Sequence, residues 1–130
     1  MGWTDAHTAL TSMATLGDGD LLIAISHSGT TRDIVDVMQA FQAKGTQTVI
    51  ITNNPRSSAA GKADMKLLTT AGESPFRSGA TASRIAQLTL VDCLCIALAQ
   101  RDMARTKTAL DQSLAAVGGR YLDTDPLPTG

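Results

Sequence analysis

The chain has 130 residues, a formal net charge of −1 and 43% hydrophobic residues, so it is long enough for one domain and too apolar to be disordered. Only 3% of the residues are aromatic, which favours helices packed on a parallel sheet over an aromatic-rich β-sandwich. Because no basic stripe accompanies this near-neutral charge, we expect no DNA contact from this chain itself.

Two elements are predicted near the N-terminus. Apolar residues recur at every third position of segment 5–16, and Thr4 or Asp5 can cap its start, which predicts a short amphipathic helix. The continuous apolar run 20–25 then predicts a strand that is covered on both faces.

The following segments complete a strand–helix–strand unit. Apolar residues at helical spacing predict a helix that begins at a capping box of Thr30 and Asp33 and ends near Gly45. These apolar residues are Ile34, Val37, Met38 and Phe41. The β-branched run 48–52 predicts the next strand. A strand–helix–strand order implies a parallel pair with a right-handed crossover.

The second half of the chain is predicted to be mostly helical. A short helical turn near 58–63 and a strand at the sheet edge over 65–69 precede two helices, one over 81–101 and one near 104–117. The helix 81–101 is apolar on several faces, which predicts burial by its own sheet and by another subunit. Because Asp92 interrupts it, we expect it to fall short of the ~20 residues of a membrane span and predict no membrane contact.

Cysteine and histidine are too sparse for a metal site. Cys93 and Cys95 are the two cysteines, and their spacing on an apolar helix predicts buried small hydrophobes rather than a metal or redox pair. The two histidines lie far apart in the sequence. We therefore expect no metal and no cofactor, and a reducing, cytoplasmic location.

The segment 26–31, SHSGTT, stands between the first predicted strand and the following helix. Open α/β sheets bind ligands at the carboxyl ends of their strands, and the free N–H groups of a helix start favour an anion. Gly29 allows close approach of the backbone, while the hydroxyls of Ser26, Ser28 and Thr31 can donate to phosphate oxygens. An ordinary turn with an N-cap explains the same residue types, and the residues alone leave both interpretations open.

The wider segment adds a resemblance to a known family. Ser26, Ser28, Gly29 and Thr31 match the pattern SxSGxT, and IAISHSGTTRDIVDVMQAFQAKGTQTVIIT resembles the central part of a sugar isomerase (SIS) domain. Residues 73–94 resemble in particular the SIS domain of RpiR-type transcriptional regulators. The resemblance implies an α/β fold: a three-layer α-β-α arrangement with a parallel, flavodoxin-like sheet.

The same resemblance implies a site for the phosphate and sugar of a phosphosugar. The implied binding residues are Ser26, His27, Ser28, Gly29, Thr30, Thr31, Glu73 and Ser83. Glu73 is either a hydroxyl acceptor near the sugar or an exposed loop carboxylate, and Ser83 is either a helix cap or a group facing the sugar. Isomerisation needs a placed base. Glu73, His7 and His27 form no convincing pair, so we expect no catalytic residue.

Two departures from the family are expected. The first strand and helix of an SIS domain, and the helix-turn-helix of a regulator, have no counterpart in the chain. We therefore expect a partial SIS domain over 1–120 and a C-terminal tail over 121–130. The strand 20–25 would then have an unpaired edge, which favours dimerisation or strand exchange.

The resulting hypothesis is a non-catalytic phosphosugar-binding sensor domain of a transcriptional regulator. It would signal through a homodimer or higher homo-oligomer formed by helix 81–101. Two alternatives remain at this point: an aldose–ketose phosphosugar isomerase, and a dimerisation module whose binding site is inactive.

Overall fold

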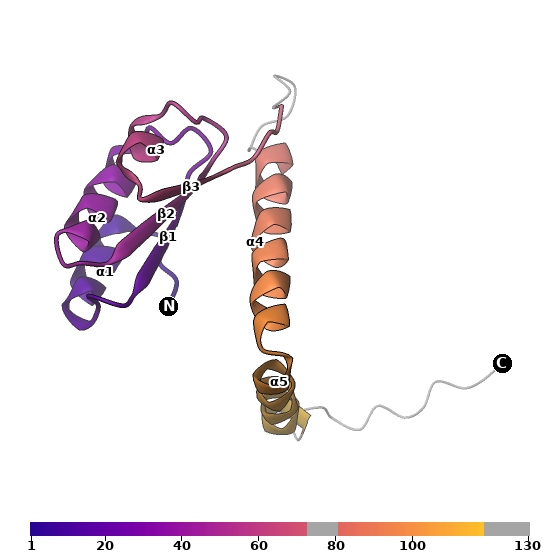
Figure 1. The fold of residues 1–130 in the computed structure, drawn as a ribbon. Helices are drawn as coiled ribbons and strands as arrows, with labels where there is room; N and C mark the ends of the chain where they lie inside the picture. The colour runs from indigo at the N-terminus through magenta and orange to yellow at the C-terminus, as the bar shows by residue number, and fades with distance from the viewer. Residues whose placement is uncertain (73–80, 119–130) are drawn as a thin grey trace. The chain divides into compact units, whose positions relative to one another are not determined.

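A computed structural model describes residues 1–72 and 81–118 of the chain (Figure 1). Contacts divide the chain into two units, Met1–Leu90 and Val91–Gly130, each considered by itself. The elements in chain order are the helix α1 (Ala6–Ser12), the 3₁₀ turn η1 (Met13–Thr15), the strand β1 (Leu21–Ile25), α2 (Arg32–Gln42), β2 (Gln47–Thr52), α3 (Ser58–Lys62), β3 (Met65–Leu68), α4 (Thr81–Arg101) and α5 (Met103–Gly118). All the predicted helices and strands are present, with bounds shifted by a few residues.

The three strands form one parallel sheet in the order β1-β2-β3. Ala24 of β1 is in register with Ile50 of β2, and Ile50 with Lys66 of β3. The predicted strand–helix–strand unit and the edge position of β3 are both confirmed. In the part of the chain that the structure describes, β1 forms the opposite edge.

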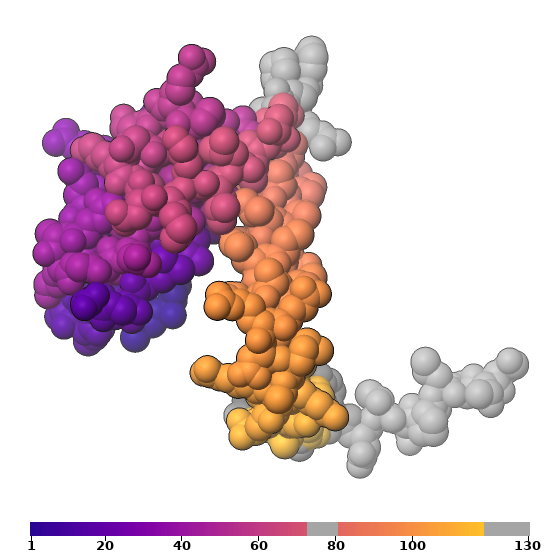
Figure 2. Space-filling view, in the orientation of Figure 1, coloured from indigo at the N-terminus to yellow at the C-terminus, as the bar shows by residue number. Residues whose placement is uncertain are grey.

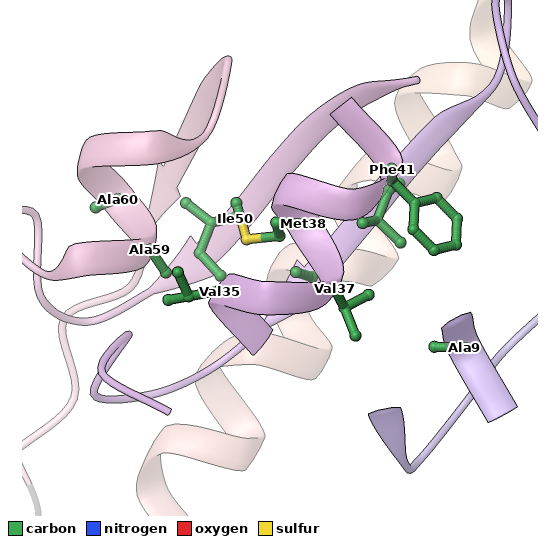
Figure 3. Packing of buried hydrophobic residues seen from close by; sticks show 10 residues of the cluster. Ala9, Val35, Val37, Met38, Phe41, Ile50, Ala59 and Ala60 are labelled. Atoms are coloured by element: carbon green, nitrogen blue, oxygen red, sulfur yellow. The ribbon is translucent and has the colours of Figure 1, made fainter. Parts of the chain in front are cut away.

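The core lies between the sheet and helices α2 and α3. Met38 and Phe41 of α2 and Ile50 of β2 have no exposed surface, and Figure 3 shows Met38 beside Ile50. Burial of a side chain of this size stabilises the fold by about 1.5–3 kcal/mol. The Trp3 ring centroid lies 6.1 Å from that of Phe41, which ties the N-terminal segment to the same core.

The expectation that the strand 20–25 is covered on both faces is wrong. Leu22 and Ala24 are buried, whereas Leu21, Ile23 and Ile25 are 52%, 47% and 44% exposed. Successive side chains of a strand point to opposite faces. Because α2 packs against one face of β1 only, the other row of side chains stays half-exposed.

Helix α4 is present as predicted, but several of its apolar side chains are exposed in the single chain, and burial by another subunit stays a prediction. Leu88 and Leu98 are 68% and 67% exposed. Figure 2 shows the orange atoms of α4 as one elongated column. Cys93 and Cys95 are exposed free thiols, so their prediction as buried hydrophobes is wrong. An apolar helix is buried only where a partner surface covers it.

The expectation that this helix is too short for a membrane is also wrong. Among the described residues, α4 alone is long and apolar enough to cross a membrane, by length and composition only. Its single acidic residue, Asp92, does not change that result. One such helix is weak evidence for a membrane span.

Asp64 fixes the start of β3 to β2. Its carboxylate accepts hydrogen bonds from the hydroxyl and the backbone N–H of Thr48, both at 2.8 Å. These bonds lower the pKa of the Asp64 carboxyl below its ordinary value of 3.8. A carboxyl with a lowered pKa stabilises the folded chain above its ordinary pKa, and this contribution is lost as the pH falls through the folded-state value.

We therefore expect Asp64→Asn to lower the melting temperature at pH 7 and to reduce the loss of stability between pH 5 and pH 3. Thermal denaturation followed by circular dichroism over this pH range tests both effects. Asp36→Asn is the matched control, because Asp36 forms only an exposed ion pair with Arg32 at 3.7 Å, a type that contributes little. Equal melting temperatures for the two variants would contradict the assignment.

Candidate functional site

The segment SHSGTT lies where its sequence position predicted, between the carboxyl end of β1 and the amino end of α2. Two backbone hydrogen bonds hold its start beside the end of β2. Ser26 N–H donates to the Ile51 carbonyl at 3.0 Å, and Asn53 N–H donates to the His27 carbonyl at 3.0 Å. The segment is therefore positioned by the sheet.

The hydroxyls of this segment bond to one another and to its backbone. Ser26 is buried, and its Oγ accepts a hydrogen bond from Gly29 N–H at 3.1 Å. Ser28 Oγ accepts from both the N–H and the hydroxyl of Thr30, at 3.3 and 2.9 Å. Because Ser28 accepts in both bonds, its own hydroxyl proton remains available to a ligand. Ser28, Thr30 and Thr31 are exposed.

The predicted capping box is wrong. The N-cap of α2 is Thr31, in extended conformation, and no side chain caps the helix. Thr30 does not cap because the helix begins one residue later than predicted, which places Thr30 before the N-cap position. The first N–H groups of a helix have no partner within it and carry partial positive charge. An uncapped helix start beside three exposed hydroxyl side chains suits an oxyanion.

Gly29 is required by a close contact with the next loop. Its φ is +65°, and a Cβ at this position would overlap Ser57 Oγ and lie 3.0 Å from Thr52 Oγ1. Its carbonyl accepts a hydrogen bond from Ala59 N–H of α3 at 3.0 Å. The backbone of segment 26–31 thus packs directly against a side chain of the loop before α3.

Two residues that sequence reasoning missed position this segment. Thr52 donates its hydroxyl to the His27 carbonyl at 3.1 Å, and Ser57 caps α3 by accepting from Ala60 N–H at 3.2 Å. Thr52 ends the strand predicted over 48–52, and Ser57 lies in the loop that follows it. Because the carboxyl ends of parallel strands meet at one edge of the sheet, this position could have identified both residues as neighbours of segment 26–31.

The structure brings six of the eight predicted binding residues together. Ser26, His27, Ser28, Gly29, Thr30 and Thr31 form one continuous segment. Ser83 is 1% exposed and lies in the first turn of α4, and its role toward a ligand stays a prediction. Glu73 lies outside the described residues. Within residues 1–72 and 81–118, no group of three or more His, Cys, Asp or Glu side chains is placed to hold a metal ion.

Comparison with known sequences finds one family over most of the chain. The sequence model of the SIS domain matches residues 3–117. An uncharacterised HTH-type transcriptional regulator of Caldanaerobacter subterraneus is 42% identical over 76% of this chain and 35% of its own length. The HTH-type transcriptional regulator RpiR of Escherichia coli is 29% identical over 88% of this chain and 39% of its own length. The chain thus spans well under half of these relatives.

Solved structures share the fold. NanR of Vibrio vulnificus, solved in complex with ManNAc-6P, superimposes with a TM-score of 0.83 at 25% identity over 95% of this chain and 46% of its own. A putative phosphosugar isomerase from Bacteroides fragilis gives a TM-score of 0.66 at 29% identity over 75% of this chain and 54% of its own. These likenesses confirm the predicted α/β fold with a parallel sheet.

The Gly29 contact leads to a stability prediction. We expect Gly29→Ala to destabilise the fold by at least about 1–2 kcal/mol, because an L-residue at positive φ costs that much before the overlap with Ser57 is counted. Gly61→Ala is the matched control. Gly61 lies in α3, and a Cβ added to it would meet nothing within 4 Å, so alanine is expected to raise stability by up to about 1 kcal/mol. Urea unfolding of both variants measures the difference, and equal midpoints would refute it.

Proposed function

Since the chain belongs to the SIS domain family, we propose that it binds a phosphorylated sugar at segment 26–31. It acts as the non-catalytic sensor part of a transcriptional regulator. The observation that carries this proposal is the uncapped start of α2 beside the exposed hydroxyls of Ser28, Thr30 and Thr31. Two further facts support it: the sequence relatives are HTH-type regulators, and one structural neighbour is complexed with a phosphosugar.

The hydroxyls and the helix start act on different parts of a phosphate. The N–H groups of the first turn of α2 provide partial positive charge, which stabilises an anion. The Ser28 and Thr31 hydroxyls donate to individual oxygens, while the Thr30 hydroxyl donates to Ser28 Oγ and supports it. Ser26 Oγ accepts from the Gly29 N–H, which holds the loop in shape, and its own hydroxyl proton remains available to a phosphate oxygen.

A sensor explains the loop better than an isomerase does. Moving a proton between adjacent sugar carbons needs a base within hydrogen-bond reach. His27 is the one residue of segment 26–31 with a nitrogen base in its side chain, and its Nδ1 is buried with no hydrogen-bond partner that would orient the ring toward a substrate. Conversion of an aldose phosphate into a ketose phosphate by the purified chain would overturn the sensor proposal.

Helix α4 supplies the route for signalling. Its apolar side chains Ile85, Leu88 and Leu98 are 60–68% exposed, and a patch of this kind is typical of a subunit interface. Pairing of α4 with a second copy gives a dimer, and a ligand that stabilises one arrangement of the dimer changes the activity of attached domains. A protein of this class works in the cytoplasm.

Phosphosugar binding is tested by thermal shift of the purified chain. The panel consists of ManNAc-6P, arabinose 5-phosphate, glucose 6-phosphate and ribose 5-phosphate. We expect at least one of these sugars to raise the melting temperature, because a ligand that binds only the folded state stabilises it. Ser28→Ala removes a phosphate donor and is expected to raise the dissociation constant about tenfold.

Ser12→Ala is the matched control for this variant. Ser12 donates to the Ala9 carbonyl in α1, away from segment 26–31, so its affinity should equal that of the wild type. Absence of a shift with every sugar would favour a bare dimerisation module. Unchanged affinity in Ser28→Ala would remove this residue from the site.

Assembly through α4 is tested by placing a charge on it. We expect the wild type to be a dimer or larger in light scattering, and Leu88→Glu to shift it toward the monomer by burying an unpaired charge. Thr89→Glu is the control, since Thr89 is exposed and its hydroxyl donates only to the Ile85 carbonyl of the same helix. A monomeric wild type, or co-sedimentation with phosphatidylcholine vesicles, would contradict the interface.

A further inference from the structure

Two buried polar atoms of the described chain have no hydrogen-bond partner. They are Nδ1 of His27 and Oγ1 of Thr69. Thr69 is only 7% exposed, whereas the other buried threonines with hydroxyl bonds, Thr46, Thr48 and Thr52, all reach a partner. A buried hydrogen-bonding group without a partner costs about 1–3 kcal/mol, so each such group in a folded chain needs an explanation.

Both atoms lie at the carboxyl end of the sheet. Thr69 directly follows β3, and its N–H donates to the Thr52 carbonyl at 3.0 Å, which continues the parallel ladder past the strand. Ala71 N–H donates to Oδ1 of Asn53 at 2.8 Å. The segment after β3 is therefore fixed beside the ends of β2, and β2 lies between it and the segment 26–31.

The distance between segment 26–31 and Thr69 suits a ligand that is longer than a phosphate. Neighbouring strands lie about 4.8 Å apart, so the ends of β1 and β3 are separated by about 10 Å. A phosphate held at the start of α2 lies on the β1 side. The sugar hydroxyls farthest from the phosphate can then extend across β2 to Thr69.

The Thr69 hydroxyl has no bond within the fold. Its backbone N–H makes the structural contact, and its side-chain oxygen makes none. Valine has the same shape without the hydroxyl, so at this position it would fill the space and remove the unpaired group. A fold selected only for stability would favour valine here.

We propose that Thr69 is a sugar-recognition residue, whose hydroxyl bonds to a sugar hydroxyl remote from the phosphate. This proposal rests on the proposed function. Oγ1 itself has essentially no exposed surface, but the residue retains 7% exposure. A rotation of Thr69 about its Cα–Cβ bond to another staggered position therefore accompanies binding. His27 Nδ1, within the phosphate segment, is the second unpartnered group available to the sugar.

The test compares Thr69→Val with Thr69→Ser in the purified chain. Binding of the tightest phosphosugar from the four-sugar panel and of inorganic phosphate is measured by calorimetry. We expect Thr69→Val to weaken phosphosugar binding about 5- to 10-fold, because one hydrogen bond to the sugar is lost. Inorganic phosphate binding stays unchanged. Thr69→Ser retains the hydroxyl and is expected to bind the phosphosugar within about twofold of the wild type.

Melting temperatures separate recognition from a structural role. Thr69→Val is expected to melt at or above the wild-type temperature, since it loses no bond. Thr48→Val is the matched control: the Thr48 hydroxyl donates to Asp64 and accepts from Gln42 at 2.7 Å, so this variant is expected to melt lower. A Thr69→Val variant that melts as low as Thr48→Val would overturn the proposal.

The binding outcomes also distinguish the role of Thr69 from the proposed function on which it rests. Equal phosphosugar affinity in wild type and Thr69→Val overturns the role of Thr69 and leaves the phosphate site intact. Equal weakening of phosphosugar and inorganic phosphate overturns it as well, because the effect would then lie at the phosphate. A wild type that binds none of the four sugars refutes the proposed function, and the role of Thr69 with it.

Discussion

The contact between the Gly29 backbone and the side chains of Ser57 and Thr52 fixes the geometry on which the candidate site depends. No Cβ fits between them, so the segment after β1 and the loop after β2 approach as closely as a backbone allows. That approach sets the direction in which the chain leaves β1 and enters α2. It also lets the Gly29 carbonyl bond to α3. The path of the backbone between β1 and α2 then places the hydroxyls of Ser28, Thr30 and Thr31 at the start of α2.

This arrangement concentrates polar groups at one edge of an otherwise apolar layer. The core of Met38, Phe41 and Ile50 holds α2 against the sheet, so the helix start cannot move far from the strand ends. Rigid placement matters for a ligand whose recognition depends on a few short hydroxyls, since a small displacement would separate them from the phosphate oxygens. The apolar core thus contributes to affinity without touching the ligand.

Much of the fold follows from the sequence because it is encoded in local periodicity. The helical spacing of Ile34, Val37, Met38 and Phe41 and the β-branched run 48–52 place their elements to within a few residues. The segment 26–31 is also recognisable, because it is continuous in the chain. The capping box was wrong because α2 begins one residue later than predicted, and the sequence does not distinguish Thr30 from Thr31 as the N-cap.

Other features depend on contacts between segments that lie far apart in the sequence. Thr52, Ser57 and Thr69 belong to different connections and meet only where parallel strands end together. Exposure is similarly non-local: Cys93 and Ile23 are apolar in sequence, but burial depends on which surface covers them. The division of the chain into a domain over 1–120 and a tail over 121–130 stays a prediction.

The half-exposed row of Leu21, Ile23 and Ile25 has a consequence for the chain during its synthesis and purification. Five uncharged apolar residues without proline, two of them isoleucines, form a strand with no described neighbour on one side, and such a strand templates the pairing of other chains. Asp18 and Asp20 stand immediately before it and make aligned stacking of several copies repulsive. A charge that flanks an apolar strand in this way disfavours its edge-to-edge pairing with other copies.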